Sequence, residues 1–335
     1  MEELLRVEDL HTYFYTYEGV VKAVDGVSFD IRKGEIFGLV GETGCGKSVT
    51  ALSIIGLIDD PGKIVGGKII FKGKNLLELG EEEMRKIRGK EISMIFQEPM
   101  TALNPVYTIG DQMIELLLLH EEGIANLRKA PKELKEEKKK KAIEMLRLVR
   151  MPDPERTIDS YPHELSGGMR QRAMIAMMLA TKPSLLIADE PTTALDVTVQ
   201  AQILNILMDM RDKLGISILL ITHDLSVIAE VTDRVGVMYA GNIVEVADTF
   251  TIFQNPKHPY TVGLMEAIPK ITEKKEMLKS IRGSVPNLIY PPSGCRFHPR
   301  CDYMKPICKK KKPKLVEVEP GHLVACHLYG GEENE

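Results

Sequence analysis

The chain has 335 residues, and its 44 Lys and Arg stand against 48 Asp and Glu, which gives a net charge of −4. This length allows about two domains, and a hydrophobic content of 44% is typical of a globular chain rather than a disordered one. The near balance of charge excludes binding to polyelectrolytes through bulk charge. No uncharged apolar run reaches the ~18–20 residues that span a bilayer, and the acidic N-terminus is unlike a secretory signal. We therefore expect an uncleaved cytoplasmic chain that does not itself cross a membrane.

Strand and helix patterns alternate along the first part of the chain. The apolar run at 35–40 predicts a buried strand, and the apolar spacing of 47–57 predicts a helix directly after it. Residues 185–188 and 217–221 predict two more buried strands, and the apolar positions between them predict a helix that ends at Gly215. This order predicts a βαβ unit with a parallel sheet, and hence an α/β fold.

A charged segment interrupts this alternation. Residues 120–145 are rich in Lys and Glu at helical spacing and hold little apolar content before Ile143. We interpret them as an exposed helical subdomain inserted in the sheet. The Lys and Glu run at 132–141 is more often a solvated helix face than a binding surface, and we expect a solvated face here.

A glycine-rich loop lies between the first predicted buried strand and its helix. Its sequence, GETGCGKS, fits the pattern G-x-x-x-x-G-K-[ST] in the strand and helix context that the motif requires. The glycines let backbone N–H groups turn toward phosphate oxygens, and the helix N-terminus adds partial positive charge. The lysine reaches the terminal phosphates and the serine ligates Mg²⁺, whereas the plain alternative is an ordinary Gly-rich turn. The predicted nucleotide-binding residues are Gly41, Glu42, Thr43, Gly44, Cys45, Gly46, Lys47, Ser48 and Val49.

Two acids, Asp189 and Glu190, follow the predicted strand at 185–188. They lie at the carboxyl edge of a parallel sheet, where open α/β folds bind ligands. We expect Asp189 to bind Mg²⁺ and Glu190 to polarise the water that attacks the γ-phosphorus of ATP. Two acids after a strand are by themselves more often a polar loop, and it is the phosphate loop upstream that favours the nucleotide interpretation.

The segment LSGGMRQ, which starts at Leu165, precedes a long apolar helical pattern. Its free N–H groups and the helix dipole predict a second anion site, although a plain helix cap is the alternative. The segment matches the signature loop of ABC transporter ATPases, and the chain resembles that family over about residues 5–250. The resemblance implies a head-to-tail dimer in which the signature of one subunit completes the ATP site of the other. The signature residues are Ser166, Gly167, Gly168 and Met169.

The same resemblance assigns roles to residues elsewhere in the chain. Gln97 is similar to the Q-loop glutamine, a further Mg²⁺ ligand, Asp196 to the D-loop aspartate, and His223 to the switch histidine that contacts the γ-phosphate. Phe14 best matches the aromatic residue that stacks on adenine, whereas an aromatic cluster on a strand is otherwise commonly core. The implied fold is a P-loop NTPase. It has a RecA-like core with antiparallel β and helical subdomains, the helical one at about 100–165.

Residues 251–335 form a C-terminal extension, and its part from residue 269 onward is compositionally separate. From residue 269 onward, 13 Lys and Arg stand against 8 Asp and Glu, a net charge of +5. Four thiols within a short basic segment favour one shared metal site, because soft thiolates suit zinc or an iron–sulfur cluster. Zinc sites usually show paired C-x₂₋₄-C knuckles, which are missing here, and disulfides stay open because they occur inside hyperthermophile cells. The four cysteines are Cys295, Cys301, Cys308 and Cys326.

This extension resembles that of the oligopeptide and dipeptide branch of ABC importers, the nickel/peptide type, in which such a quartet binds a [4Fe–4S] cluster. The chain would then be the ATP-hydrolysing motor of a peptide importer, peripheral on the cytoplasmic face of the cell membrane. Its expected partners are two membrane permease subunits, a solute-binding protein and a second ATPase subunit, identical or paralogous, but no nucleic acid. The alternatives are the same machinery importing oligosaccharides or another solute, a soluble ABC ATPase, and a redox or regulatory iron–sulfur protein with a degenerate nucleotide site. Because the chain has one cassette, no long coiled-coil insertion and intact motif residues, we favour the importer.

Overall fold

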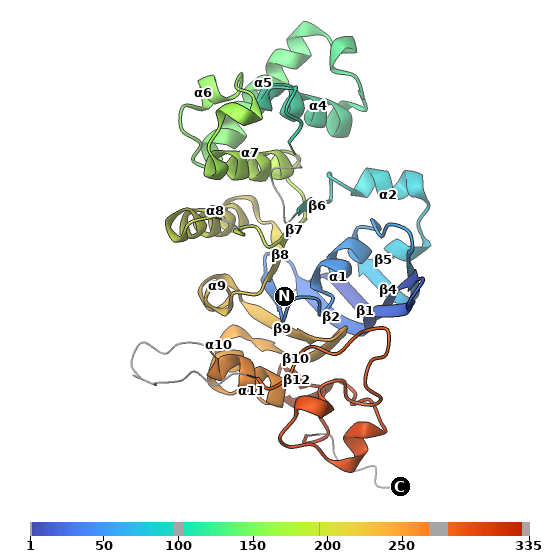
Figure 1. Ribbon diagram of the computed structural model, residues 1–335. Coiled ribbons are helices and arrows are strands. Elements are labelled where there is room, and N and C mark those ends of the chain that lie inside the picture. The colour runs from blue at the N-terminus through green and yellow to red at the C-terminus, as the bar shows by residue number, and fades with distance from the viewer. Residues whose placement is uncertain (1, 97–102, 194, 268–280, 330–335) are drawn as a thin grey trace. The chain divides into compact units, whose positions relative to one another are not determined.

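The computed structural model describes residues 2–96, 103–193, 195–267 and 281–329 (Figure 1). The chain divides into two compact units. The first unit comprises Met1–Arg32, Ile36–Glu78 and Ile221–Glu335, and the second comprises Lys33–Glu35 and Leu79–Leu220. The phosphate-binding loop therefore belongs to the first unit, whereas the acidic pair and the signature segment belong to the second.

An antiparallel sheet with the strand order β2-β1-β4-β5 forms one part of the first unit. The long strands β1 and β2 pair as a hairpin, from Glu3 opposite Arg32 to Thr16 opposite Gly19. Alternate residues of β1, such as Leu5 and Val7, are fully buried. Helix α1 contacts β1 and β2, so this sheet supports the helix that follows the phosphate-binding loop. The elements are β1 (Glu3–Thr16), β2 (Gly19–Arg32), α1 (Lys47–Ile54), β4 (Gly62–Phe71), β5 (Lys74–Asn75) and the 3₁₀ turn η1 (Leu76–Glu78).

The first unit also holds five neighbouring strands of a second, larger sheet, in the order β11-β12-β10-β9-β3. Strand β3 is buried at all five positions and pairs in parallel with β9. Continuous burial explains why β3 is uniformly apolar, and it confirms the strand predicted at 35–40. A Cβ at Gly38 would lie 2.7 Å from Cδ1 of Ile228, so the glycine lets helix α9 pack closely on β3. These elements are β3 (Ile36–Val40), α9 (Leu225–Val231), β9 (Arg234–Tyr239) and β10 (Asn242–Asp248).

The C-terminal extension packs into this same unit, and Figure 1 shows it in orange and red beside β10. Strand β12 pairs antiparallel with β10, with Val324 opposite Glu245. The rings of Tyr239, Tyr260 and Phe297 lie with centroids 4.6–5.4 Å apart and join β9 to the extension. The elements of the extension are α10 (Thr249–Gln254), α11 (Pro259–Glu266), the 3₁₀ turns η4 (His298–Arg300) and η5 (Pro306–Lys309), β11 (Val316–Glu319) and β12 (His322–Val324).

In the second unit the strands follow the order β8-β7-β6, and β6 pairs in parallel with β7. Helix α8 connects β7 to β8, which confirms the predicted βαβ unit. The helix ends where expected, because Gly215 has φ +68° and its N–H donates to the carbonyl of Arg211. The elements are β6 (Ile92–Ile95), β7 (Leu185–Asp189), α8 (Val197–Leu214) and β8 (Ser217–Thr222), whose last two residues belong to the first unit.

The helical part of the second unit forms a cluster of its own, drawn in green in Figure 1. Helices α4 and α5 pack against each other, and Ile114, Leu118 and Ala130 form a small apolar core there. The members of this part are α4 (Ile109–Glu122), η2 (Leu127–Lys129), α5 (Lys132–Leu148), α6 (Pro154–Thr157), η3 (Pro162–Glu164) and α7 (Gly167–Leu179), and α2 (Glu81–Ile87) precedes them in the chain.

The expectation of a solvated face along 132–141 is wrong at Lys138. Its side chain is 1% exposed, and its ammonium donates to the carboxylates of Glu121 at 2.6 Å and Glu122 at 2.7 Å. Burial alone would lower the pKa of Lys138, but these hydrogen bonds raise it, so the side chain stays charged. The lysine therefore ties α5 to the end of α4 instead of facing solvent.

Within the ranges that the structure describes, no helix has both the length and the apolar character that crossing a membrane requires.

Candidate functional site

The phosphate-binding loop leaves β3 and leads directly into α1. Gly41 and Gly46 have φ values of +154° and +104°, which L side chains rarely adopt. A Cβ at Gly41 would lie 2.0 Å from the carbonyl oxygen of Met238, and a Cβ at Gly46 would lie 2.3 Å from that of Ala23. Both glycines are therefore required by the close approach of neighbouring backbone, and together they give the loop its curvature.

Lys47 lies inside this loop. Its side chain is 5% exposed, and its ammonium donates to the carbonyl oxygens of Gly41 at 2.8 Å and Glu42 at 3.2 Å. Cys45 beneath it is fully buried, and burial raises the pKa of its thiol although Lys47 acts in the opposite direction. Ser48 lies half-buried in the first turn of α1. The loop thus presents a buried cation and a helix N-terminus, which is the arrangement that binds phosphate.

The acidic pair ends β7 in the second unit. Asp189 is 3% exposed, and Glu190 follows it with φ +46°, in the left-handed region. The carboxylate of Glu190 accepts a hydrogen bond from the hydroxyl of Thr193 at 2.9 Å. A residue other than glycine in this region costs about 1–3 kcal/mol, and such strain concentrates at functional sites. The strained backbone at Glu190 could not be predicted from the sequence, and it adds to the reasons for assigning this residue a function.

The signature segment forms the start of α7. Ser166 is the N-cap, and its hydroxyl accepts from the N–H of Met169 at 3.3 Å. A Cβ at Gly168 would lie 3.0 Å from Cγ1 of Val199 in α8. Asp196 is in turn the N-cap of α8 and accepts from the N–H of Val199 at 2.9 Å. Gly168 of the signature and the expected D-loop aspartate therefore both contact Val199, near the N-termini of two helices.

One buried hydrogen bond in this unit has no signal in the sequence. Gln171 is 1% exposed, and its amide nitrogen donates to the carbonyl of Pro191 at 2.5 Å. This hydrogen bond joins α7 to the residue that follows Glu190, so the signature helix and the strained acid are directly linked. Gln171 and Pro191 are 20 residues apart in the sequence, and no local pattern around Gln171 predicts this contact.

Three further expected residues have different environments. Phe14 is half-buried on β1, and Gly62 of β4 leaves space for its ring, which a Cβ there would approach within 2.6 Å. His223 is exposed and directly follows β8. Gln97 lies outside the described residues. The phosphate loop, Phe14 and His223 thus lie in the first unit, and the acidic pair, the signature and Asp196 lie in the second.

The four cysteines of the extension gather in one region of the first unit. All four are free of disulfides, so the disulfide alternative is not what the structure contains. The N–H of Cys295 donates to the carbonyl of Cys308 at 2.8 Å, which joins the two segments that carry them. Burial first, and then the nearby charges of the other three, raise the pKa of Cys295 to about 11, and burial with two cysteine neighbours does the same for Cys326.

These thiols do not by themselves form a cage for one ion. Among the described residues, no three His, Cys, Asp or Glu side chains are arranged so that they could hold a metal ion. Three histidines of the extension make contacts of their own. Nδ1 of His298 lies 2.9 Å from the carbonyl of Cys295, Nε2 of His327 lies 2.8 Å from the carbonyl of Lys311, and His322 contacts Glu245. The donor set suits soft metals by its chemistry, but its arrangement gives no direct support to the expected metal centre.

The sequence of this chain matches two models of known protein families. Residues 24–193 match the family model described as "ABC transporter". The chain belongs to the ABC transporter family. Residues 244–308 of this ABC transporter ATPase match a second model, "Oligopeptide/dipeptide transporter, C-terminal region". The second match covers Tyr260, Cys295 and Arg300, so the extension is part of what relates the chain to the oligopeptide and dipeptide type.

Individual relatives align along nearly the whole chain. This ABC transporter ATPase is 53% identical over 325 residues to the probable peptide ABC transporter ATP-binding protein y4tR of Sinorhizobium fredii, covering 96% of this chain and 94% of that protein. It is 49% identical over 329 residues to the dipeptide transport ATP-binding protein DppD of Bacillus subtilis, covering 98% and 95%. It is also similar to the dimeric post-hydrolysis structure of the ATP-binding cassette MJ0796 bound to ADP and Pi, with a TM-score of 0.63 and 27% identity over 73% of this chain and 99% of that one. The fold is thus that of an ABC-type P-loop NTPase.

Proposed function

We propose that this chain is the ATP-hydrolysing motor subunit of an ABC importer for di- and oligopeptides. The observation that carries the proposal is that one chain holds both halves of a composite ATP site. The phosphate loop has Lys47 buried inside it, and the signature helix begins with the capped Ser166 and two glycines. The names of the relatives, which are peptide and dipeptide transport ATP-binding proteins, support peptides as the solute.

In the proposed reaction the loop N–H groups and Lys47 bind the phosphates of ATP. Ser48 and Asp189, with Gln97, would hold the Mg²⁺ that neutralises the developing charge. Glu190 orients the attacking water as general base, and His223 contacts the γ-phosphate. Phe14 offers an aromatic face to the adenine. Each residue thus acts through an interaction that its side chain is chemically able to make.

The second half of the site requires a second ATPase subunit, identical or paralogous. Ser166, Gly167, Gly168 and Met169 would contact ATP bound by the partner, so that ATP closes the dimer and hydrolysis releases it. Two membrane permease subunits would turn this closure into movement of the solute, and a solute-binding protein would deliver it. We place the chain on the cytoplasmic face of the membrane, bound to those permeases.

Hydrolysis is tested by Glu190→Gln. Glutamine preserves size and can still accept from Thr193, but it cannot act as a base, so the variant should bind Mg-ATP, accumulate as a dimer and lose nearly all turnover. Lys47→Ala should instead weaken ATP binding itself. Glu144→Gln, an exposed position in the same unit, is the matched control and should hydrolyse at the wild-type rate. Wild-type turnover by Glu190→Gln would remove that residue from the mechanism.

The composite site is tested by mixing subunits. Lys47→Ala destroys the phosphate loop and Gly168→Asp destroys the signature, so each variant alone should be inactive. Because mixed dimers contain one intact composite site, turnover should reappear on mixing. Since Gly168 packs against Val199, the thermal stability of Gly168→Asp must first be shown to match that of the wild type. No recovery with dimers present would show that each chain acts alone.

The solute is tested in vesicles that contain the permeases encoded beside this chain. ATPase activity should rise when a loaded solute-binding protein and a dipeptide or oligopeptide are added. Stimulation only by an oligosaccharide or by nickel would reassign the solute and keep the motor. An absence of permease genes and of any stimulation would favour a soluble ABC ATPase.

We further propose that Cys295, Cys301, Cys308 and Cys326 bind a [4Fe–4S] cluster. What supports this is the gathering of four disulfide-free thiols, together with the cysteine quartet that the resemblance of the extension to the peptide-importer branch implies. A four-iron cluster is wider than one ion, so its ligands need not converge on a single point as zinc would require. Anaerobically purified protein should be brown and hold about four iron and four sulfide per chain, and Cys301→Ser should bleach it. Colourless protein with one zinc, or with no metal, would reject the cluster.

A further inference from the structure

One residue of the phosphate loop, Glu42, is held at all three of its polar groups. Its carbonyl accepts from the ammonium of Lys47 at 3.2 Å. Its N–H donates to the hydroxyl of Tyr260 at 3.0 Å, and its carboxylate accepts two hydrogen bonds from Arg300, at 2.9 and 3.2 Å. Two of these three partners lie in the C-terminal extension, so the extension touches the loop that binds phosphate.

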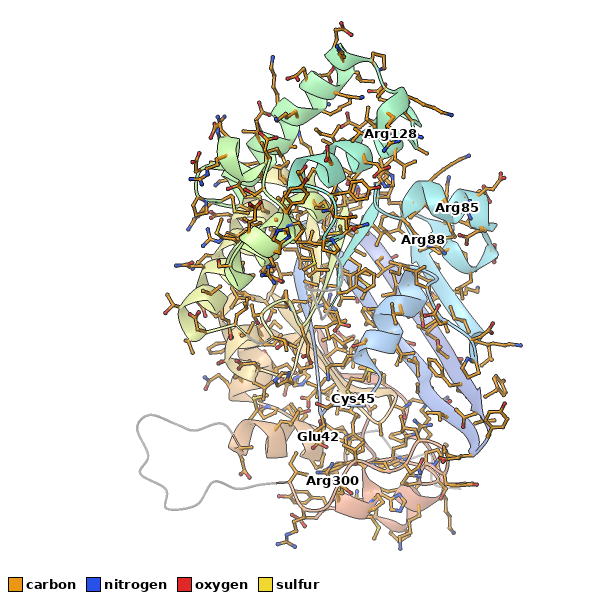
Figure 2. All side chains as sticks on the ribbon, turned by 45° about the horizontal axis from the view of Figure 1, so that its top comes forward. Glu42, Cys45, Arg85, Arg88, Arg128 and Arg300 are labelled. Atoms are coloured by element: carbon orange, nitrogen blue, oxygen red, sulfur yellow. The ribbon has the colours of Figure 1, made fainter. Side chains whose placement is uncertain are left out.

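Arg300 is built into its position. Its side chain is 7% exposed, and its guanidinium carbon lies 5.7 Å from the ring centroid of Tyr239 and 6.0 Å from that of Phe297. Its Nε donates to the carbonyl of Arg282 at 2.7 Å, and its two terminal nitrogens make their shortest hydrogen bonds to the carboxylate of Glu42. A planar guanidinium that lies on aromatic rings and donates hydrogen bonds from all of its nitrogens has little freedom to move. Figure 2 shows Arg300, Glu42 and Cys45 in succession at this end of the loop.

Tyr260 is held equally firmly. It is fully buried in α11, and its ring lies 4.6 Å from that of Tyr239 and 5.4 Å from that of Phe297. Its hydroxyl therefore meets the Glu42 N–H from a fixed point. Since the loop binds phosphate through its backbone N–H groups, the direction of each peptide in it determines how well the site fits ATP.

The charge of Glu42 gives the ion pair a second role. The carboxylate is 26% exposed and belongs to a loop that must accept the most highly charged part of ATP. An unpaired carboxylate there would repel the phosphates, because like charges disfavour each other over several ångströms in partly buried surroundings. The bidentate pair with Arg300 neutralises this charge and holds the Glu42 side chain in one rotamer.

We propose that the C-terminal extension sets the ATP affinity of the phosphate loop, with Arg300 and Tyr260 as positioning residues that act through Glu42. This inference rests on the proposed ATPase function. The extension is then a working part of the nucleotide site and not only an appendage to it.

The test is ATP binding and turnover by Arg300→Met in the full-length protein. We expect the Kd and KM for Mg-ATP to rise about tenfold while kcat changes less than twofold, because the loop binds ground state and transition state alike. Adding Glu42→Gln removes the unpaired charge, so the double variant should recover most of the affinity that Arg300→Met loses. Arg282→Met is the matched control, because Arg282 contributes only its carbonyl to Arg300 and its side chain is 88% exposed.

A second variant, Tyr260→Phe, removes one hydroxyl and leaves the packing of the ring in place. It should raise the Kd for Mg-ATP by about threefold or more, because the Glu42 N–H loses its acceptor. A lower melting temperature with an unchanged Kd, in either variant, would show a merely structural role and overturn the proposal. So would an Arg300→Met affinity equal to that of Arg282→Met, or losses that simply add in the double variant.

These outcomes are distinct from a failure of the ATPase function itself. If the wild-type chain bound no Mg-ATP, and Lys47→Ala changed nothing, the proposed function would fall. If the wild type bound and hydrolysed ATP while Arg300→Met did so equally well, only the role of the extension would fall.

Discussion

Glu245→Gln should destabilise the first unit far more than its conservative size suggests. Glu245 is fully buried on β10, and three donors converge on its two carboxylate oxygens. One oxygen accepts from the N–H of Lys257 at 2.7 Å and from Nε2 of His322 at 2.7 Å, and the other accepts from the N–H of His258 at 2.9 Å. Because a carboxylate accepts only, all three groups must be donors.

The magnitude follows from this geometry. Glutamine replaces one oxygen with an NH₂ donor, so in either orientation an NH₂ group faces a backbone N–H, and one buried donor or more loses its acceptor. Each buried unsatisfied group costs about 1–3 kcal/mol, so the variant should lose roughly 2–4 kcal/mol. For a unit of this size each kcal/mol shifts Tm by about 2–4 °C, which gives a decrease of roughly 5–15 °C.

Thermal unfolding at pH 7 measures the effect, with Glu18→Gln as control because Glu18 is exposed in the turn between β1 and β2. Hydrogen exchange should localise the loss, since the amides of Lys257 and His258 should exchange faster in the variant. A Tm within about 2 °C of the wild type, or unchanged exchange at these two amides, would refute the reasoning.

Three further predictions concern other buried groups. Burial lowers the pKa of His258 from 6.5 to about 3. Between these values the unfolded chain binds a proton that the folded chain does not, so the free energy of unfolding decreases as the pH falls, by about 1.4 kcal/mol per pH unit. His258→Asn keeps an acceptor for the Tyr260 N–H but cannot take up this proton, so its Tm should change less than that of the wild type between pH 7 and pH 5. Gly46→Ala should weaken ATP binding by more than about tenfold, whereas Gly34→Ala, at φ +70° with open space, should cost only about 1 kcal/mol of stability in denaturant titration. Lys138→Met should cost about 1–3 kcal/mol, less than a fully buried pair because its carboxylate partners are 31–56% exposed, and the exposed Lys140→Met should cost almost nothing.

Local pattern was enough to predict the strands β3, β7 and β8, the helix between the last two and its end at Gly215. Each of these depends on the spacing of apolar residues or on one glycine. Pairings across long sequence separations could not be predicted in this way. Lys138 was misjudged because its partners lie on the preceding helix, 16 and 17 residues away.

The candidate site shows the same division. Its motifs were visible because they are contiguous, and the spacing of glycines in the loop has a direct backbone cause. The bond between Glu42 and Arg300 joins residues 258 apart, and nothing local in either segment indicates it. The strain at Glu190 was equally hidden, because a left-handed backbone at an acid has no sequence signature.

The pairing of β12 with β10 has a consequence for the solubility of the chain. Six consecutive residues of β10, Asn242 to Ala247, are buried, and an unpaired strand of this kind is a template for intermolecular association. The outer strand β11 is short and places exposed glutamates at alternate positions, Glu317 and Glu319. Charges of this kind discourage a further strand from adding to the edge. The extension therefore covers an aggregation-prone edge strand and leaves a protected strand at the edge of the sheet. A chain shortened before β11 should form insoluble aggregates instead of a smaller ATPase.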